Sequence, residues 1–562
     1  MPGITSVSHA YRVAIIAALC LKTSWAQEVP APAAHAFHLQ QGRLSATFRD
    51  NRLSPGRLSG IDSLLHIQSA PDFDAFDPEQ TNASAGLNFE HIISGHRNPH
   101  NKFSPRQGRY TLHPVVPERS VVFVRRAEDS PWKMDSRLTC TVVKPHYIDF
   151  EFQCIPRDAS LFGTRRYAIL FFANYMNDVT NVALHFRGQT SANSGESWVA
   201  ATAPKSHPDW NRGGNYRSLP ASDLAYDSDT EFRLNSWSYD WPRFTQPFYF
   251  GRAANNMTMV LMFDRMHSNR DEIRFSLYKF KLPRRMRPAW DFQYVIRQIQ
   301  TDQTYGFRGR LAWKPFVNPD DCLQEYHRWA AGLEQQTTQE RQKRVQELRD
   351  TGATVFLRNG RVNEVSANRT KITDAQITLL ANFKQMTDLS LEATRVSDAG
   401  AVHLRHLQQL EWLNLYRTQI GNQGLRSIGQ LRRLTHLPIG ATRVTDAGLT
   451  HLRNLKQLVY LGLRGNPITD AGVMQLSELR QLEGLHLGET RVGDKGIRIL
   501  GTLRRLQKLW LDQTSVSDRA IDTLVQFQDL RELHIRQTRI TAMGKARLKR
   551  QLPKCQLFDS AD

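Results

Sequence analysis

Leu407–Gly424, with the sequence LQQLEWLNLYRTQIGNQG, is one copy of a unit that repeats along the C-terminal part of the chain. Its apolar residues follow the pattern L-x-x-L-x-x-L-x-L-x-x-T-x-I. The aliphatic residue that closes this pattern recurs every 24 residues in eight copies, without an insertion: Ile372, Val396, Ile420, Val444, Ile468, Val492, Val516 and Ile540. A constant period of this length predicts a stacked array of supersecondary units.

Each copy contains an L-x-L pair, such as Leu413 and Leu415, that predicts a short strand. Alternate side chains of a strand point to the same face, so both leucines of a pair face inward. The equivalent pairs are Leu389/Leu391, Leu437/Ile439, Leu461/Leu463, Leu485/Leu487, Leu509/Leu511 and Leu533/Ile535. Because one short strand cannot bury that face alone, neighbouring copies must stack on one another.

The segment after each strand reads V-T-D-A-G-L or a variant of it, best seen at Val444–Leu449. Thr445 and Asp446 are residue types that cap the N-terminus of a helix, and Leu449 with Leu452 begins a helical face. The unit is therefore predicted to be a strand, a turn and a helix. The eighth copy has Ala542 in place of the Asp, as expected of an atypical terminal copy.

These copies resemble the leucine-rich repeat family over about Arg361–Leu557, and they are similar to its helix-bearing ribonuclease-inhibitor and F-box types. The resemblance implies an α/β solenoid that serves as a binding scaffold. Where the family usually carries Asn, this chain has Asn466 once and Thr in seven copies: Thr370, Thr394, Thr418, Thr442, Thr490, Thr514 and Thr538. The departure is conservative, because a buried Thr hydroxyl can still satisfy backbone groups of the turn.

Residues 1–26 have the pattern of a signal peptide. Arg12 precedes the apolar run Val13–Leu21, and Ser24 and Ala26 supply small residues at the cleavage positions. The apolar run is too short to span a bilayer. We expect cleavage after Ala26 and export to the periplasm, the cell surface or the extracellular space, with no transmembrane segment left in the mature protein.

Residues 27–317 alternate short runs rich in Val, Phe, Tyr and Thr with Gly, Pro, Asn and Asp, a pattern typical of an antiparallel β-sandwich. The clearest runs are Ser120–Val124, Leu138–Val143, Tyr147–Cys154, Tyr167–Phe172, Val182–Phe186, Thr258–Phe263 and Ile273–Phe280. The predicted fold is therefore multidomain, with an N-terminal antiparallel β-sandwich followed by an α/β leucine-rich-repeat solenoid at residues 361–562.

Four cysteines follow the signal segment, namely Cys140, Cys154, Cys322 and Cys555, and none lies in a C-x-x-C spacing that would indicate zinc. Cys140 and Cys154 flank a predicted hairpin turn at Lys144–His146. A disulfide between them in an oxidising compartment and a pair of buried thiols both fit this arrangement.

Residues 318–360 are predicted to form a helical linker and a hairpin cap. Cys322–Leu333 and Thr338–Arg349 have helical patterns, and Asn318-Pro319-Asp320 can open a helix. Asn359-Gly360 is the strongest short hairpin signal. A hairpin at this point would cover the open edge of the first repeat.

Residues between and beside the L-x-L pairs should line the solvent side of the curved sheet, which is the usual binding face of such arrays. Trp, Tyr and Arg at such positions dominate interface energies. We predict that a protein or glycan partner contacts this concave face through Trp412, Tyr416, His436, Tyr460, Arg464, His486, Trp510, His534 and Arg536.

The formal net charge of +20 favours an acidic partner or an anionic surface, although we do not expect nucleic acid. A row of cations at helix ends, from Lys384 to Arg504, and a row of Asp at helix starts, from Asp374 to Asp518, both complement helix dipoles without a ligand. A turn row lacks that explanation, so either an anionic partner or solvent accounts for it: Lys371, Arg395, Arg443, Arg491 and Arg539.

The sequence has no G-x-S-x-G, no H-E-x-x-H and no Gly-rich phosphate loop, and we predict no cofactor and no metal site. Asp264–Glu272 concentrates titratable groups, which suits either general acid–base chemistry or a plain polar loop. Stacking on sugar rings and packing at a sheet edge both fit a group of aromatics: Trp237, Tyr239, Trp241, Phe248 and Tyr249.

The leading hypothesis from these patterns is an exported binding protein in which the repeats contact another macromolecule. The alternative is a carbohydrate-active enzyme, or a sugar-binding protein, in which the N-terminal β-sandwich acts and the repeats direct it to its target. The sequence therefore leaves a catalytic function of residues 27–317 open.

Overall fold

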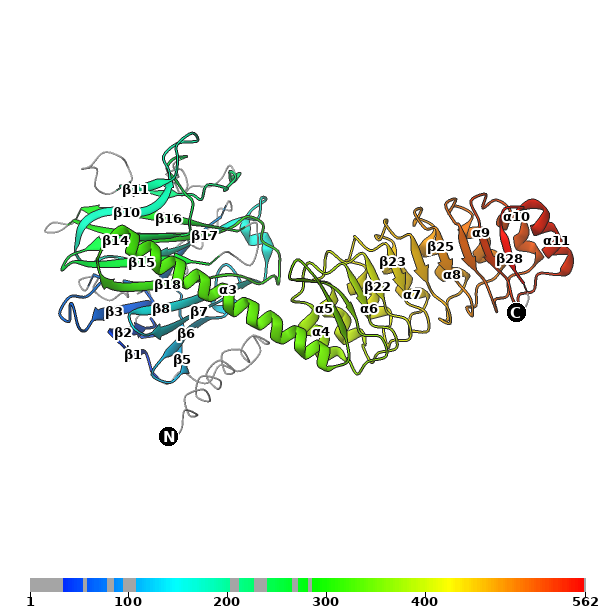
Figure 1. Ribbon diagram of the computed structural model, residues 1–562, viewed down its shortest axis with the longest axis horizontal. Helices are drawn as coiled ribbons and strands as arrows, with labels where there is room; N and C mark the ends of the chain where they lie inside the picture. The colour runs from blue at the N-terminus through cyan, green and yellow to red at the C-terminus, as the bar shows by residue number, and fades with distance from the viewer. Residues whose placement is uncertain are drawn as a thin grey trace, which may run out of the picture. The chain divides into compact units, whose positions relative to one another are not determined.

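The computed structural model describes residues 34–53, 58–77, 85–94, 108–202, 212–226, 240–264, 271–281 and 286–559. The predicted signal segment at residues 1–26 lies outside these ranges. The chain divides into two compact units, Met1–Gly332 and Leu333–Asp562 (Figure 1). The division falls inside a helix, within residues 318–360, where the sequence predicts a helical linker.

The first unit consists of antiparallel sheets, as expected. A three-stranded sheet contains β1 (Ala36–Gln41), β2 (Leu44–Arg49) and β3 (Gly60–His66). A five-stranded sheet has the order β12 (Arg212–Tyr216), β16 (Glu272–Lys281), β17 (Met286–Ile296), β9 (Ala168–Ala173) and β4 (Asn88–Ile93). The described residues of this unit also form the short 3₁₀ helices η1 (Ala127–Asp129) and η2 (Ala159–Phe162).

The largest sheet of the first unit has ten strands, with β13 (Arg243–Phe244) paired to β10 at its side. Its other strands, in spatial order, are β11 (Ser197–Ala201), β10 (Val179–Gln189), β14 (Phe248–Ala253), β15 (Met257–Phe263), β18 (Tyr305–Pro315), β8 (Tyr147–Pro156), β7 (Met134–Val143), β6 (Ser120–Arg125) and β5 (Thr111–Val116). Each of the seven runs identified in the sequence forms part of one strand in this unit, except that Tyr167 lies just before β9.

Aromatic rings fill the space between the five-stranded sheet and the largest sheet. Phe172 on β9 and Phe292 on β17 both contact Phe307 on β18 edge to face, with ring centroids 5.2 and 5.5 Å apart. Phe152 on β8 also contacts Phe172 at 5.0 Å. Such edge-to-face pairs add to the energy of burying the rings, so this aromatic cluster anchors the two sheets to each other.

Cys140 and Cys154 are free thiols, so of the two alternatives left by the sequence the structure has the buried pair. The register of the β7–β8 hairpin explains why no disulfide joins them. Cys140 lies opposite Phe150 and Cys154 lies opposite Ser136, which sets the two cysteines well apart along the ladder. Burial raises the pKa of both thiols.

A single helix, α3 (Pro319–Asp350), spans the region where the sequence indicated two helical segments. The residues between those segments, Glu334–Thr337, include no proline or turn pair, so nothing interrupts the helix. Near its start, Glu325 accepts hydrogen bonds from Lys314 at 2.8 Å and Tyr147 at 2.6 Å. Near its end, Val345 and Leu348 are buried in the core of the repeats.

The hairpin predicted at Asn359-Gly360 is present as β19 (Thr354–Arg358) and β20 (Arg361–Ser366). Both turn residues have a positive φ, 51° and 69°, as this type of hairpin turn requires. β20 pairs in parallel with the first strand of the repeats, β21. The hairpin therefore covers the edge of the repeat sheet, as the sequence suggested.

The second unit continues as eight strand–helix copies on one parallel sheet. The strands are β21 (Asp388–Ser390), β22 (Trp412–Asn414), β23 (His436–Pro438), β24 (Tyr460–Gly462), β25 (Gly484–His486), β26 (Lys508–Trp510), β27 (Glu532–His534) and β28 (Gln556–Phe558). The helices are α4 (Asp374–Leu380), α5 (Asp398–Leu404), α6 (Asn422–Ile428), α7 (Asp446–Leu449), η4 (Thr450–Leu452), α8 (Asp470–Val473), η5 (Met474–Leu476), α9 (Asp494–Leu500), η6 (Asp518–Ala520), α10 (Ile521–Leu524) and α11 (Ala542–Gln551).

The repeated leucines form the core of this unit. Leu413, Leu415 and Ile420 are fully buried, as are their equivalents in the central copies. The Thr at the family's Asn position donates its hydroxyl to the backbone oxygen three residues earlier, for example Thr418 to Leu415 at 2.7 Å. This bond satisfies a buried carbonyl of the turn, which confirms the role expected for Thr.

A carboxylate joins each copy to the next. In the fourth copy, Asp446 accepts the backbone N–H of Thr469 at 2.8 Å with one oxygen and the Thr469 hydroxyl at 2.6 Å with the other. The same bond to the following N-cap residue occurs at every junction, from Asp374, Asp398, Asp470, Asp494 and Asp518 and, as an amide, from Asn422. We call these seven contacts the junction bonds.

The sequence predicted N-cap chemistry at these positions, and each helix does begin after Thr, Ser or Gly. The hydroxyl of Thr445 has another partner than expected, however. It accepts a hydrogen bond from Asn422 of the preceding copy at 2.9 Å and makes no bond to an amide of its own helix. The hydroxyl of Thr445 therefore acts between copies, whereas those of Ser397, Thr469, Ser517 and Thr541 also accept an amide of their own helix, as predicted.

In the second to sixth copies and in the eighth, a glycine at the third helical position leaves room for the preceding junction bond. A Cβ on Gly472 would lie 2.1 Å from Asp446 Oδ1, and the equivalent distances at Gly400, Gly424, Gly448, Gly496 and Gly544 are 2.2 to 2.5 Å. The seventh copy has Ala520 at this place. Its helix is also the one that opens with a 3₁₀ turn, η6. In the D-A-G motif, the Asp is thus explained by the hydrogen bonds that it accepts and the Gly by the space that those bonds require.

We expect Gly472→Ala to destabilise the repeats by about 1 to 3 kcal/mol, because the new methyl group overlaps Asp446 and must break the junction bonds to Thr469. Ala447→Gly, at an exposed helical position, serves as the control and should cost about 1 kcal/mol or less. Urea unfolding of the full chain measures both. A smaller loss for Gly472→Ala than for the control contradicts this account.

Candidate binding face on the parallel sheet

Alternate side chains of each short strand point to the solvent side of the parallel sheet. Side chains at equivalent positions of successive strands lie next to one another there. His436, Tyr460, His486, Trp510 and His534 all lie on this face, and the structure brings these five predicted residues into ring contact. We call them, together with Phe558, the aromatic row. Trp412 is also half-buried on the sheet but makes no ring contact within the described part of the chain.

Trp510 is the centre of the aromatic row. It stacks on His486 at 5.3 Å and on His534 at 5.5 Å, with interplanar angles of 16° and 26°. Tyr460 contacts Trp510 edge to face, with ring centroids 6.1 Å apart, and it stacks on His436 with ring centroids 6.3 Å apart. These distances are typical of favourable aromatic pairs, so the row is packed before any partner arrives.

Phe558 was missed by the sequence analysis, although it extends the row. It stacks on His534 with ring centroids 4.1 Å apart and an interplanar angle of 7°. The signal that could have found it is its position, 24 residues after His534 in the strand β28. The pairing of β27 with β28 shows that the sheet continues beyond the last L-x-L pair recognised in the sequence.

Glycines on the same face make room for the rings. A Cβ on Gly484 would lie 2.8 Å from the ring of Tyr460, and one on Gly488 would lie 2.9 Å from the ring of His486. Gly484 occupies the strand position between Tyr460 and Lys508 in the sheet register. Tyr460 can therefore reach across Gly484 to Trp510, which a side chain at this position would prevent.

The remaining predicted residues contact charged neighbours. Arg464 donates to Glu489 at 2.8 Å, and the guanidinium of Arg417 lies 5.3 Å from the ring of Tyr416. The backbone N–H of Arg536 donates to Asp512 at 2.8 Å. Two of these contacts, Arg464 to Glu489 and Arg536 to Asp512, therefore join adjacent copies beside the aromatic row.

His486 is neutral over the physiological pH range. Burial, with a smaller effect of Arg464, lowers its pKa to about 4. Its Nδ1 accepts the backbone N–H of Gly488 at 3.2 Å, which leaves the proton of the neutral ring on Nε2. Burial also lowers the pKa of His534. The two imidazoles thus act as neutral rings in the stack.

In the first unit, Asp264 and Asp271, two of the three described residues of the titratable segment Asp264–Glu272, have separate partners. Asp264 accepts a hydrogen bond from Arg308 at 3.0 Å, and Asp271 accepts one from Tyr294 at 2.8 Å. Burial raises the pKa of Asp271 to about 6. Residues 265–270, including His267, lie outside the described residues.

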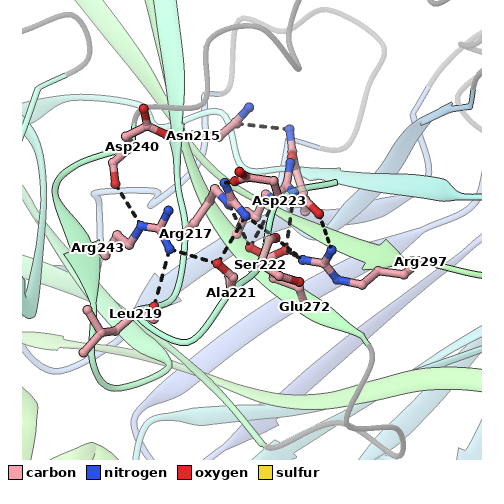
Figure 2. Close-up of polar contacts among 12 residues, drawn as sticks. Asn215, Arg217, Leu219, Ala221, Ser222, Asp223, Asp240, Arg243, Glu272 and Arg297 are labelled. Atoms are coloured by element: carbon pink, nitrogen blue, oxygen red, sulfur yellow. Dashed lines mark hydrogen bonds and ion pairs between the residues drawn. The ribbon is translucent and has the colours of Figure 1, made fainter. Parts of the chain in front are cut away.

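Glu272 is the centre of a buried ion group. Arg274 and Arg297 approach its carboxylate at 3.2 and 2.9 Å, and Arg217 approaches at 3.6 Å. Figure 2 shows Arg217, Arg243 and Arg297 pointing to the loop after β12, where Arg243 donates to the carbonyl of Ala221 at 2.9 Å. Arg297 donates to the carbonyl of Ser222 at 2.7 Å. The group therefore holds an irregular loop whose carbonyls have no ladder partners.

The aromatic residues considered for sugar stacking do not form one platform. Phe248 and Tyr249 are fully buried in the core of the first unit, so an exposed role for them is wrong. The Tyr249 hydroxyl donates to the backbone oxygen of Trp290 at 2.9 Å. Trp241 is half-buried, with the guanidinium of Arg243 5.5 Å from its ring. Trp237 and Tyr239 lie outside the described residues.

Within the described residues, no group of three or more His, Cys, Asp and Glu side chains is arranged to hold a metal ion. No helix in the same part of the chain is long and apolar enough to cross a membrane. Among these residues, the aromatic row is the place where most of the predicted contact residues come together.

Residues 359–554 match the family model of a leucine-rich repeat region. This region belongs to the leucine-rich repeat family. Among solved structures, the leucine-rich repeats are similar to an internalin from Listeria monocytogenes, with 26% identity and a TM-score of 0.30, over 35% of this chain and 54% of that one. No curated protein matches the sequence.

Two further structures illustrate the range of similar leucine-rich repeat proteins. A protein of Leptospira interrogans has 19% identity and a TM-score of 0.25, over 35% of this chain and 60% of that one. A plant receptor kinase ectodomain from Arabidopsis thaliana, in complex with Casparian strip integrity factor 2, has 16% identity and a TM-score of 0.27, over 36% and 25%. The chain spans less than two thirds of each of these three structures.

We expect the stability of the leucine-rich repeats to fall by up to about 3 kcal/mol between pH 6.5 and pH 4 through His486 alone. The unfolded imidazole takes up a proton near pH 6.5, whereas the folded one does so only at about 4, so acid favours the unfolded chain across that window. His486→Phe keeps the stack on Trp510 and removes the titration. Urea unfolding at several pH values should show a smaller loss for the variant, and equal losses contradict the prediction.

Proposed function

We propose that this protein is an exported binding protein whose repeats form a solenoid and bind a protein partner through the concave face of the parallel sheet. The observation that carries the proposal is the aromatic row centred on Trp510. Export rests on the signal pattern of residues 1–26. The two large sheets of the first unit are proposed to form a β-sandwich that supports the repeats.

The chemistry of the aromatic row suits a binding site. Trp, Tyr and Arg supply most of the energy at protein interfaces, and rigid rings lose little conformational entropy when a partner binds. Trp510 and Tyr460 remain half-exposed although they contact neighbouring rings. Stacking on His486 and His534 has already fixed the orientation of Trp510. Binding would therefore use apolar area at a low entropic cost.

The orientation of the rings favours a protein over a glycan. A sugar packs on the open face of an aromatic ring, but Trp510 and His534 are each stacked against two neighbouring rings. The ring edges remain, and they carry N–H donors such as the Trp510 indole and His486 Nε2. Edge donors beside apolar carbons match the carbonyls and side chains of a polypeptide.

We expect Trp510→Ala to lower the affinity for the partner at least tenfold, because it removes the ring on which three others pack. The control variant Trp412→Ala also removes a tryptophan side chain from this sheet, but outside the aromatic row. This variant should still capture the partner. The full chain and both variants are immobilised and exposed to the exported proteins of the native host. Equal capture by both variants would remove the reason for choosing the aromatic row.

A second candidate function, a carbohydrate-active first unit, rests on the other face of the five-stranded sheet. Two rows of buried side chains cross this face in register. One row contains Asn215, Ser276 and Asp291, and the other contains Arg274, Gln293, Phe171 and His91. Burying polar groups on a sheet face lowers the stability of the fold. Proteins keep such buried polar groups most often at functional sites.

Two carboxyl groups on this face have different surroundings. Glu90 occupies a bulge in the β4–β9 ladder and accepts the Tyr175 hydroxyl at 2.8 Å. Asp291 accepts the N–H of Asn174 at 2.7 Å, and burial, with a smaller effect of Glu90, raises its pKa well above the usual range. A glycosidase uses one carboxyl group to protonate the glycosidic oxygen and a second as base or nucleophile, and two carboxyl groups with different surroundings suit that division of roles.

If this second candidate holds, the full chain releases reducing ends from a polysaccharide and Asp291→Asn lowers the rate at least about a hundredfold. Asp264→Asn, which disturbs the pair with Arg308, is the matched control and should retain activity. A panel of neutral and acidic polysaccharides tests this. No release by the wild-type chain, or equal loss in both variants, rejects the candidate.

A further inference from the structure

An open depression of about 780 Å³ lies on the helix side of the repeats, at the end of α9. Arg498 stands in the last turn of that helix, and Arg504 follows it in the loop. Arg480, 24 residues before Arg504, enters from the preceding copy. The complete lining is Arg480, Arg498, Gly501, Thr502, Arg504, Thr523 and Gln526. The depression is thus distinct from the sheet face that carries the aromatic row.

The three guanidinium groups have few hydrogen-bond or ion-pair partners in the described part of the chain. Arg498 makes no hydrogen bond or ion pair there, and Arg480 comes no closer than 3.8 Å to Glu478. Arg504 reaches only the neutral Gln526, at 3.4 Å. Each guanidinium has five N–H donors in a fixed plane, so most of the donors at this depression are left for solvent or a ligand.

Arg505, the residue after Arg504, is an example of an arginine in this array that is paired with a carboxylate. It donates to Glu483 at 2.9 Å, and Arg433 makes the equivalent bond to Glu411 at 3.1 Å. Arg498 and Arg504 therefore differ from these paired arginines in lacking a carboxylate, and Arg480 has only the longer contact to Glu478 at 3.8 Å. The helix dipole explains why cations are favoured near helix ends, but it does not use their N–H donors.

The floor of the depression is small and polar. Thr523 is buried, and its hydroxyl makes no hydrogen bond to a described residue. A Cβ on Gly501 would meet Thr523 at 3.3 Å, so the glycine keeps the space open. The lining contains no aromatic side chain on which a nucleobase could stack. Guanidinium forks above a floor with a hydroxyl group match the oxygens of a carboxylate or sulfate.

We propose that this depression binds the carboxylate or sulfate groups of an acidic polysaccharide. An open site between adjacent copies can hold one segment of a long chain, and the chain can continue along the row of cations at equivalent positions, Lys456, Arg432 and Lys384. The expected export of the protein would place it among such polymers. The site would hold the protein on an anionic matrix while the sheet face remains available.

The test measures binding of the full chain to dextran sulfate, to polygalacturonate and to neutral dextran. Replacement of Arg480, Arg498 and Arg504 by Gln should lower the affinity for at least one acidic polymer tenfold or more. The matched control replaces Arg395, Arg443 and Arg491 of the turn row by Gln, which removes the same charge from exposed positions that do not converge. This control should change the affinity less than threefold.

The two acidic polymers separate sulfate from carboxylate recognition, and either result supports the proposal. Equal losses in both triple variants would mean that overall charge alone binds the polymer, and the proposal would be wrong. Failure of the wild-type chain to bind either acidic polymer would also overturn it. So would tighter binding to single-stranded DNA of the same charge than to both polymers. Thermal unfolding of both variants controls for the fold, since all six arginines are exposed.

Discussion

The junction bond between an aspartate and the next copy is the interaction on which the repeat array depends. The helices of the central copies are only four to seven residues long, too short to be stable alone. Each is fixed because an Asp carboxylate of the preceding copy, or at Thr445 the Asn422 amide, accepts the backbone N–H at its start. The eighth copy has Ala542 in place of Asp, so its helix start lacks the carboxylate that forms a junction bond.

The junction bonds require a strict 24-residue period. This period determines which side chains lie next to one another on the sheet face and on the helix side. Because equivalent positions lie side by side on the parallel sheet, His486, Trp510, His534 and Phe558 come within stacking distance through sequence spacing and the close approach of parallel strands. On the helix side the same period brings Arg480 and Arg504 to one depression. The two proposed binding sites are therefore consequences of one geometric constraint.

Much of the repeat region could be predicted from the sequence, because its causes are local and recur. The leucine positions, the Thr hydroxyls and the capping hairpin at Asn359-Gly360 follow from spacing and turn chemistry. The steric role of Gly472 and the stacking of Phe558 could not be deduced without the distance between copies. In the first unit, strands were recognisable, but the burial of Phe248 and Tyr249 depends on pairing between distant segments. The continuity of α3 was missed because weak helix signals were taken as a break.

The most direct test of the junction bond is hydrogen exchange at the amide of Thr469, in the full chain and in Asp446→Ala. If the carboxylate fixes the copy, this amide exchanges in the wild-type chain only when the whole array unfolds. In the variant, its protection should fall to that of an exposed loop amide while the leucine strands remain protected. Rapid exchange of Thr469 in the wild-type chain, or unchanged protection in the variant, would contradict the account.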